Sequence, residues 1–133
     1  MLTSKDLGAA FRSVSRHLNN NGYFIFDMNT PHALKYTWDK DTHTDLKDDI
    51  GIIWQSTYNP LTKSATLFAT FFVKEGRHWI RFDEVHIEAG YSNAEIKRLL
   101  KAAGFRVRGL YDCRTMERPN RETNRIVVVA QKI

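Results

Sequence analysis

The stretch that decides the fold is Tyr23-Phe24-Ile25-Phe26-Asp27-Met28-Asn29-Thr30-Pro31, residues 23–31. A short and almost wholly apolar run such as 23–28, placed directly after a glycine, is typical of a parallel β-strand that is buried on both faces. Polar side chains at the carboxyl end of such a strand point into the crevice where open α/β sheets bind ligands. Asp27, Asn29 and Thr30 are therefore the first candidate substrate-binding residues.

A helix is predicted immediately before this strand. Thr3 is its expected N-cap, and Asp6 stands where the acid of a capping box would be. The Asn19-Asn20-Asn21-Gly22 cluster tolerates left-handed backbone and is expected to end the helix. The apolar residues between these signals recur at intervals of three and four, which places them on one helix face: Leu7, Ala10, Phe11, Val14 and Leu18.

The middle of the chain has a different pattern. Residues 31–49 are polar and irregular. Three strand-like runs follow, at Ile50–Tyr58, Ala65–Lys74 and His78–Glu88, and short connections with turn-forming residues join them. Such connections are typical of β-hairpins. We therefore expect a three-stranded antiparallel meander.

The last third of the chain returns to alternating helix and strand. Ser92-Asn93-Ala94-Glu95 has the form of a capping box, and an amphipathic helix is expected from there to Gly104. Strands are predicted over 105–111 and over the β-branched run 126–130, with a polar loop between them.

The composition is that of a globular protein, and 133 residues suit one domain. No apolar run approaches the ~20 residues of a membrane helix, no secretory signal pattern is present, and the one cysteine, Cys113, fits a reducing compartment. We therefore expect a cytoplasmic protein with no membrane partner. The formal net charge is +5, but the basic residues are scattered among acids, which argues against nucleic-acid binding.

Three segments, in the right order, resemble the second half of the class I S-adenosylmethionine-dependent methyltransferases. Residues 20–31 are similar to that family's glycine turn and a strand with an Asp-x-Asn-Thr-Pro-like tail. Tyr91–Phe105 resembles its penultimate helix and "AAGF" turn, and Arg125–Lys132 resembles its last strand. The resemblance implies an α/β fold with a partial Rossmann-like methyltransferase sheet, the C-terminal half, and an inserted three-stranded antiparallel lid.

The resemblance also implies how this partial domain is organised. Residues 1–31 supply a helix and a strand of the main sheet, residues 32–90 form the insertion, and residues 91–133 supply a helix and two closing strands. The last strand is expected to run antiparallel between the other two. An open edge on strand 23–28 and an uncovered apolar helix face are expected. Homo-oligomerisation or a missing N-terminal half would cover them.

The implied cofactor is S-adenosyl-L-methionine, and the implied substrate is a small-molecule methyl acceptor. In this family a glycine-rich turn after the first strand holds the cofactor, and the seven glycines of this chain include no such turn. We therefore expect no cofactor-binding residues in this chain and no activity from the chain alone.

The family's lid contributes to acceptor binding, so the aromatic residues of the insertion are candidate pocket walls. Ordinary packing of the small sheet is the alternative for each. His86 resembles a family histidine that follows a run of acids, and it is the candidate catalytic base. Its alternative is a structural histidine beside Glu84 or Glu88. No metal-ligand pattern is present. The candidate walls are Trp54, Tyr58, Phe72, Trp79 and Phe82.

Two other functions stay open at this point. One is a non-catalytic remnant or interaction module that keeps the fold without binding the cofactor, which the absence of the glycine-rich turn favours. The other is a basic nucleic-acid-binding domain, which would bind with strong salt dependence and which the scattered charge disfavours.

Overall fold

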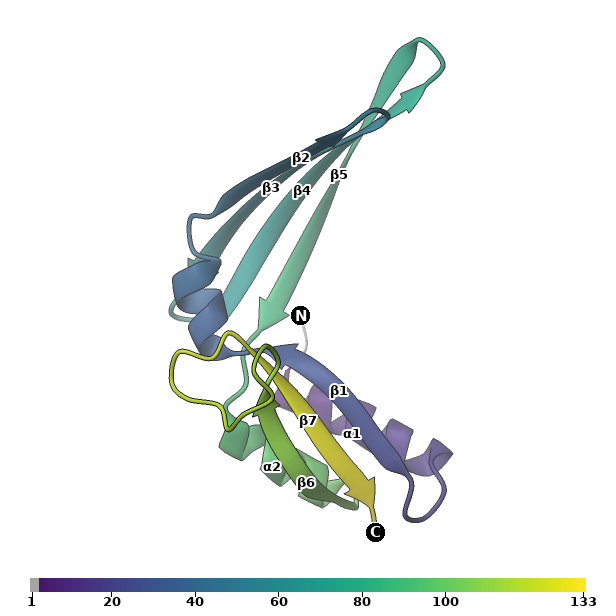
Figure 1. Cartoon of the computed structure of the whole chain (residues 1–133), viewed down its shortest axis with the longest axis vertical. Coiled ribbons are helices and arrows are strands. Elements are labelled where there is room, and N and C mark those ends of the chain that lie inside the picture. Colours follow the sequence, from purple (N-terminus) through teal and green to yellow (C-terminus); the bar gives the residue numbers. More distant parts are fainter. Residues whose placement is uncertain (1–2) are drawn as a thin grey trace. The chain divides into compact units, whose positions relative to one another are not determined.

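The computed structural model describes residues 3–133, and they form two compact units (Figure 1). The larger unit consists of the chain up to Ala33 together with Ala89–Ile133, and the inserted unit is Leu34–Glu88. Among the described residues no helix is long and apolar enough to cross a membrane.

The larger unit is built on a three-stranded sheet in the order β1-β7-β6. β1 is Tyr23–Asn29, β6 is Phe105–Asp112 and β7 is Arg125–Lys132. β7 pairs antiparallel with both neighbours. The prediction that the last strand lies antiparallel between the other two is confirmed.

Two helices, α1 (Ser4–His17) and α2 (Asn93–Ala102), pack on one face of this sheet. The capping box of α1 is present, because the Thr3 side chain accepts from the Asp6 N–H and the Asp6 carboxylate accepts from the Thr3 N–H. Asn21, with a φ of 62°, takes the left-handed conformation expected after the helix. At α2 only half of the predicted box forms: the Ser92 hydroxyl accepts from the Glu95 N–H, whereas the Glu95 carboxylate accepts from the Ser4 hydroxyl of α1.

The hydrophobic core lies between the two helices and one face of the sheet (Figure 1). Phe105 is 1% exposed, and its ring centroid lies 5.8 Å from that of Phe24. Phe11 of α1 packs on Phe26 with centroids 5.3 Å apart. The expectation of an uncovered apolar helix face was wrong for α1, because Leu7 and Phe11 are buried against this core.

The opposite face of the same sheet is open to solvent. Tyr23 is 57% exposed and Ile25 is 63% exposed, while Phe24, Phe26 and Met28 of the same strand face the core. The prediction of a parallel strand buried on both faces was therefore wrong for the described chain. β1 lies at the edge of the sheet, its ladder to β7 is antiparallel, and the helices cover only one face.

The inserted unit holds a four-stranded antiparallel sheet in the order β2-β3-β4-β5. β3 is Ile50–Asn59, β4 is Ser64–Glu75 and β5 is His78–Ala89, whose last residue belongs to the larger unit. The expected meander had three strands, and β2 (Thr42–Lys47) is the missed fourth. Every residue of β2 is exposed, and no alternation of apolar residues marks it as a strand. Its backbone pairing with β3 is what makes it a strand. A short π-helix, η1 (Ala33–Thr37), precedes it.

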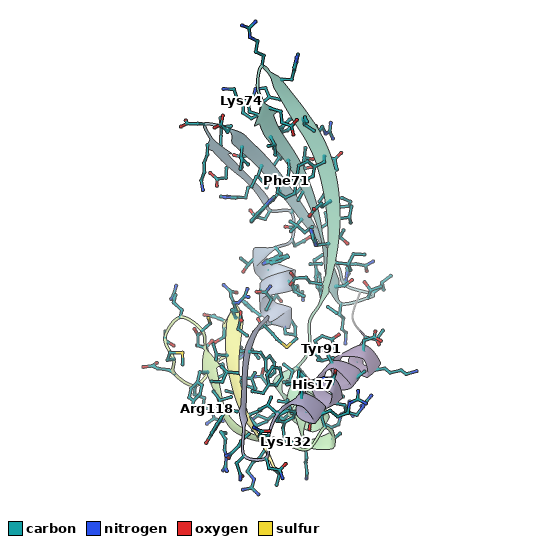
Figure 2. All side chains as sticks on the ribbon, turned by 90° about the vertical axis from the view of Figure 1, so that its right-hand side faces the viewer. His17, Phe71, Lys74, Tyr91, Arg118 and Lys132 are labelled. Carbon is teal, nitrogen blue, oxygen red and sulfur yellow. The ribbon has the colours of Figure 1, made fainter. Side chains whose placement is uncertain are left out.

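The two faces of this small sheet can be assigned from side-chain contacts. Phe71 of β4 stacks on Phe82 of β5, with centroids 4.8 Å apart. The neighbouring residue Thr70 instead donates its hydroxyl hydrogen to Asp83 at 2.7 Å. Because successive strand residues alternate between faces, Phe71 and Phe82 mark one face and Thr70 and Asp83 the other. Figure 2 labels Phe71 and Lys74 on β4.

Candidate functional site

The polar residues at the end of β1 meet an arginine from the neighbouring strand. The Arg125 guanidinium donates from Nε to the Asp27 carboxylate and from Nη1 to the Asn29 side-chain oxygen at 3.3 Å. Asn29 and Arg125 are directly paired across β1 and β7. The structure therefore brings Asp27 and Asn29 together on the open face, as a bridge held by a residue that the sequence interpretation missed.

A pocket of about 480 Å³ lies beside this bridge, where β6 ends and β7 begins. Hydrogen bonds from the Arg114 N–H and the Thr123 hydroxyl lower the pKa of the Asp112 carboxyl, one of two carboxyl groups in the lining. Side chains of both charges line the pocket. Its lining residues are Asp112, Cys113, Arg114, Glu122, Asn124 and Arg125.

Thr30 differs from the other two strand-end candidates because it is buried, at 8% exposure. Its hydroxyl donates to the Thr123 carbonyl at 2.6 Å and accepts from the Ala33 N–H at 3.1 Å. Its own N–H donates to the Asn124 carbonyl at 2.9 Å. Thr30 thus acts as the N-cap of the turn that begins at Pro31 and ties that turn to the 112–124 loop. Its role as a substrate contact stays a prediction.

Replacing Thr30 by valine tests this structural role. The substitution keeps the shape and removes the hydroxyl, so we expect the larger unit to lose about 1 kcal/mol of unfolding free energy, the usual value of an N-cap. Urea unfolding followed by far-UV circular dichroism measures it, because both long helices belong to this unit. Thr30→Ser is the control and should restore most of the loss. An unchanged midpoint for the valine variant would contradict the capping role.

The candidates in the inserted unit lie on two different faces. Trp54 pairs with Ala69 and Tyr58 with Ala65, which places both on the face that Phe71 marks. Alternation along β5 puts His86 on that same face and Trp79 on the opposite one. Trp79 therefore cannot line one pocket of the small sheet together with Trp54 and Tyr58.

His86 has the neighbour that its structural interpretation required. Its Nε2 lies 2.9 Å from the Glu84 carboxylate, two residues back on β5, and both side chains are about half exposed. A carboxylate that orients the imidazole also suits a general base, so this contact is compatible with either role. The catalytic assignment of His86 stays a prediction.

A second pocket, of about 220 Å³, lies within the inserted unit. Trp54 contributes to it and is 41% exposed. The His43 ring, on the neighbouring strand, lies 5.8 Å from the Trp54 ring between centroids. The pairing of His43 with Trp54 depends on β2, the strand that the sequence pattern did not predict. The lining residues are Trp38, Asp41, His43, Trp54, Ser56 and Leu67.

The prediction that this chain lacks a cofactor-binding glycine turn stays a prediction, although the surroundings of one glycine are known. The nucleoside cofactor of a class I methyltransferase needs a glycine turn whose backbone is left free for close approach. Gly90, in the connection from β5 to α2, is already filled: a Cβ there would lie 2.9 Å from the Pro31 Cα. Within residues 3–133, no three His, Cys, Asp or Glu side chains gather as a metal site would require.

Comparison with known proteins shows what the chain resembles. No protein-family model matches the chain. A solved S-adenosylmethionine-dependent methyltransferase from Clostridium acetobutylicum ATCC 824 superimposes with a TM-score of 0.84 at 28% identity, over 98% of this chain and 52% of that one. The amino pentose methyltransferase CalS10 from Micromonospora echinaspora has a TM-score of 0.72 at 16% identity, over 100% and 53% of the two chains, and supports the fold alone.

Two sequence relatives are also named as methyltransferases. "Putative methyltransferase YqeM" of Bacillus subtilis (strain 168) is 30% identical over 130 residues, which are 98% of this chain and 53% of the relative. "Putative methyltransferase GWCH70_2453" of Geobacillus sp. (strain WCH70) is 26% identical over 133 residues, 99% and 54% of the two chains. The chain spans about half the length of the curated relatives it matches. The predicted resemblance to half of a class I methyltransferase is confirmed, as is the α/β fold class.

Proposed function

We propose that this chain is the acceptor-side half of an S-adenosylmethionine-dependent methyltransferase that acts on a small molecule. The observation that carries the proposal is the superposition on the Clostridium acetobutylicum methyltransferase, which extends over 98% of the chain at a TM-score of 0.84. Methyl transfer depends chiefly on aligning the acceptor atom with the methyl group. A half-domain can supply that alignment while another polypeptide segment holds the cofactor.

The residues divide into three proposed roles. The inserted sheet acts as the lid, and the face that carries Trp54, Tyr58 and His86 is turned toward the acceptor, with His86 accepting its proton if the acceptor is an amine or a hydroxyl. The Asp27–Arg125–Asn29 bridge supplies polar contacts at the strand end. The open face with Tyr23 and Ile25 receives the cofactor-binding half, from another segment or a second copy of the chain. The cytoplasmic location stays a prediction.

An interaction module without catalysis is the second candidate. The open face of the sheet favours it, because it exposes two large apolar side chains, Tyr23 and Ile25, by more than half, and exposed apolar surface marks sites of association. Both candidates predict association through this face. They differ in whether the assembled protein binds the cofactor.

Calorimetric titration with S-adenosylhomocysteine, in two proteins, separates the candidates. The chain alone is expected to show no micromolar binding, with its oligomeric state measured by light scattering in the same buffer. A chimera in which this chain replaces the matched 130 residues of the Bacillus subtilis relative is expected to bind with an affinity close to that of the unaltered relative.

The unaltered relative is the control for the chimera. A chimera that folds and fails to bind, while the control binds, would favour the interaction module. Micromolar binding by the chain alone would contradict the expectation that its residues hold no cofactor site.

A further inference from the structure

We propose that the 220 Å³ pocket of the inserted unit binds a small organic cation through its ammonium group. This inference deepens the proposed function, because the bound group would be an amine acceptor or its methylated product. The use of the pocket as an acceptor subsite rests on that proposed function. The binding itself can be measured without any cofactor.

Aromatic rings form the walls of this pocket. Trp54 and His43 are directly paired across β3 and β2, with centroids 5.8 Å apart and planes inclined at 51°. Trp38 closes the pocket from the segment after η1, and Leu67 closes it from β4. An indole face carries negative electrostatic potential and attracts a cation within about 6 Å of the ring centroid. Two indoles in one small pocket therefore favour a positively charged guest.

Asp41 gives the pocket its negative charge. Its backbone is fixed, because its N–H donates to the Trp38 carbonyl at 3.3 Å and its carbonyl accepts from the Ser56 N–H at 2.9 Å. The buried Ser56 hydroxyl also donates to the Trp38 carbonyl. These bonds place Trp38 and Asp41 against β3 before any ligand arrives, which reduces the entropy cost of binding.

The side chain of Asp41 is available to a ligand. Among the described residues, it makes no hydrogen bond or ion pair, whereas the neighbouring Asp39 carboxylate accepts from the Tyr58 N–H at 3.0 Å. The lining includes no lysine or arginine. An anionic ligand would therefore meet a carboxylate with no compensating cation, which disfavours it.

The size of the pocket limits the guest further. Pockets for drug-sized ligands measure about 300–1,000 Å³, and this one measures about 220 Å³. It can enclose one head group and leave the rest of a ligand outside. A single carboxylate is too few for a hard metal ion, which needs several oxygen ligands. An alkylated ammonium group, compact and weakly hydrated, fits the rings, the charge and the volume together.

The test compares choline with its uncharged isostere, 3,3-dimethylbutan-1-ol, by ¹H–¹⁵N NMR of the three tryptophan indoles. The chain has three tryptophans, and Trp79 lies on the face away from the pocket, so it is an internal control. Choline is expected to shift the Trp38 and Trp54 indole signals saturably, with a dissociation constant in the millimolar range, and to leave Trp79 in place. The isostere is expected to bind at least tenfold more weakly.

Two variants, each with a matched control, test the charge and the ring. Asp41→Asn is expected to weaken choline binding at least tenfold, while Asp48→Asn, an equal charge change in the β2–β3 turn, leaves it unchanged. Trp54→Leu is expected to abolish binding and Trp79→Leu to preserve it.

Any one of three results would overturn the proposal: equal affinity for the isostere, shifts shared by all three indoles, or no saturable shift. These measurements use the unaltered chain, so they do not depend on the folding of any variant. If choline does not bind but the chimera binds S-adenosylhomocysteine, this proposal fails and the proposed function stands. If choline binds but the chimera does not bind S-adenosylhomocysteine, the cation site stands and the proposed function fails.

Discussion

Phe105→Ala is expected to lower the unfolding free energy of the larger unit by about 3–5 kcal/mol, the cost of truncating a buried phenylalanine. Phe105 is 1% exposed and lies in the core beside Phe24. A whole domain is stable by only about 5–15 kcal/mol, so this variant should unfold at a much lower urea concentration. The measurement is urea unfolding followed by far-UV circular dichroism, since α1 and α2 both belong to this unit.

The matched control is Phe68→Ala in β4, where the ring is 46% exposed. About half of its surface stays in water, so the expected loss is roughly 1 kcal/mol. Tryptophan fluorescence reports on this control, because Trp38, Trp54 and Trp79 all lie within Leu34–Glu88. Equal losses for the two variants would contradict the assignment of Phe105 to the centre of the core.

Gly90→Ala is expected to destabilise the larger unit by about 1–3 kcal/mol through overpacking. The added Cβ would lie 2.9 Å from the Pro31 Cα and 3.2 Å from the Pro31 nitrogen. Those are backbone atoms of a ring-constrained residue, so they cannot rotate away as the end of a flexible side chain could. The same circular dichroism experiment measures the loss.

Gly51→Ala is the control for this substitution. A Cβ at Gly51 would meet its nearest neighbour, a side-chain carbon of Leu46, at 3.4 Å. That is ordinary contact, so we expect a change within about 0.5 kcal/mol. If Gly90→Ala were as neutral as this control, the connection from β5 to α2 would not be packed tightly on Pro31.

Patterns that act locally along the sequence predicted most of the fold. The Thr3–Asp6 capping box and the left-handed Asn21 depend on a few neighbouring residues, and both are present. β2 was missed because its six residues carry no apolar face, and a partner strand defines it. The capping box at α2 was half right because the Glu95 carboxylate accepts from Ser4, a residue 91 positions away.

The candidate site shows the same division between local and distant information. The strand-end position of Asp27 and Asn29 followed from the apolar run before them. Arg125, which bridges them, lies 96 or more positions away, and only the β1–β7 register brings it there. The pairing of His43 with Trp54 likewise required β2. Which side chains meet across paired strands depends on the strand register, so a fixed spacing in the sequence does not predict these contacts.

The contact between Gly90 and Pro31 has a consequence for how such a chain can change over generations. The excursion that forms the inserted unit leaves near Pro31 and returns near Gly90, two residues in direct contact. Deleting, lengthening or exchanging the inserted segment would leave the β1-β7-β6 sheet and its helices intact. The inserted unit can therefore be exchanged as one piece, while the three-stranded sheet and its two helices are inherited unchanged.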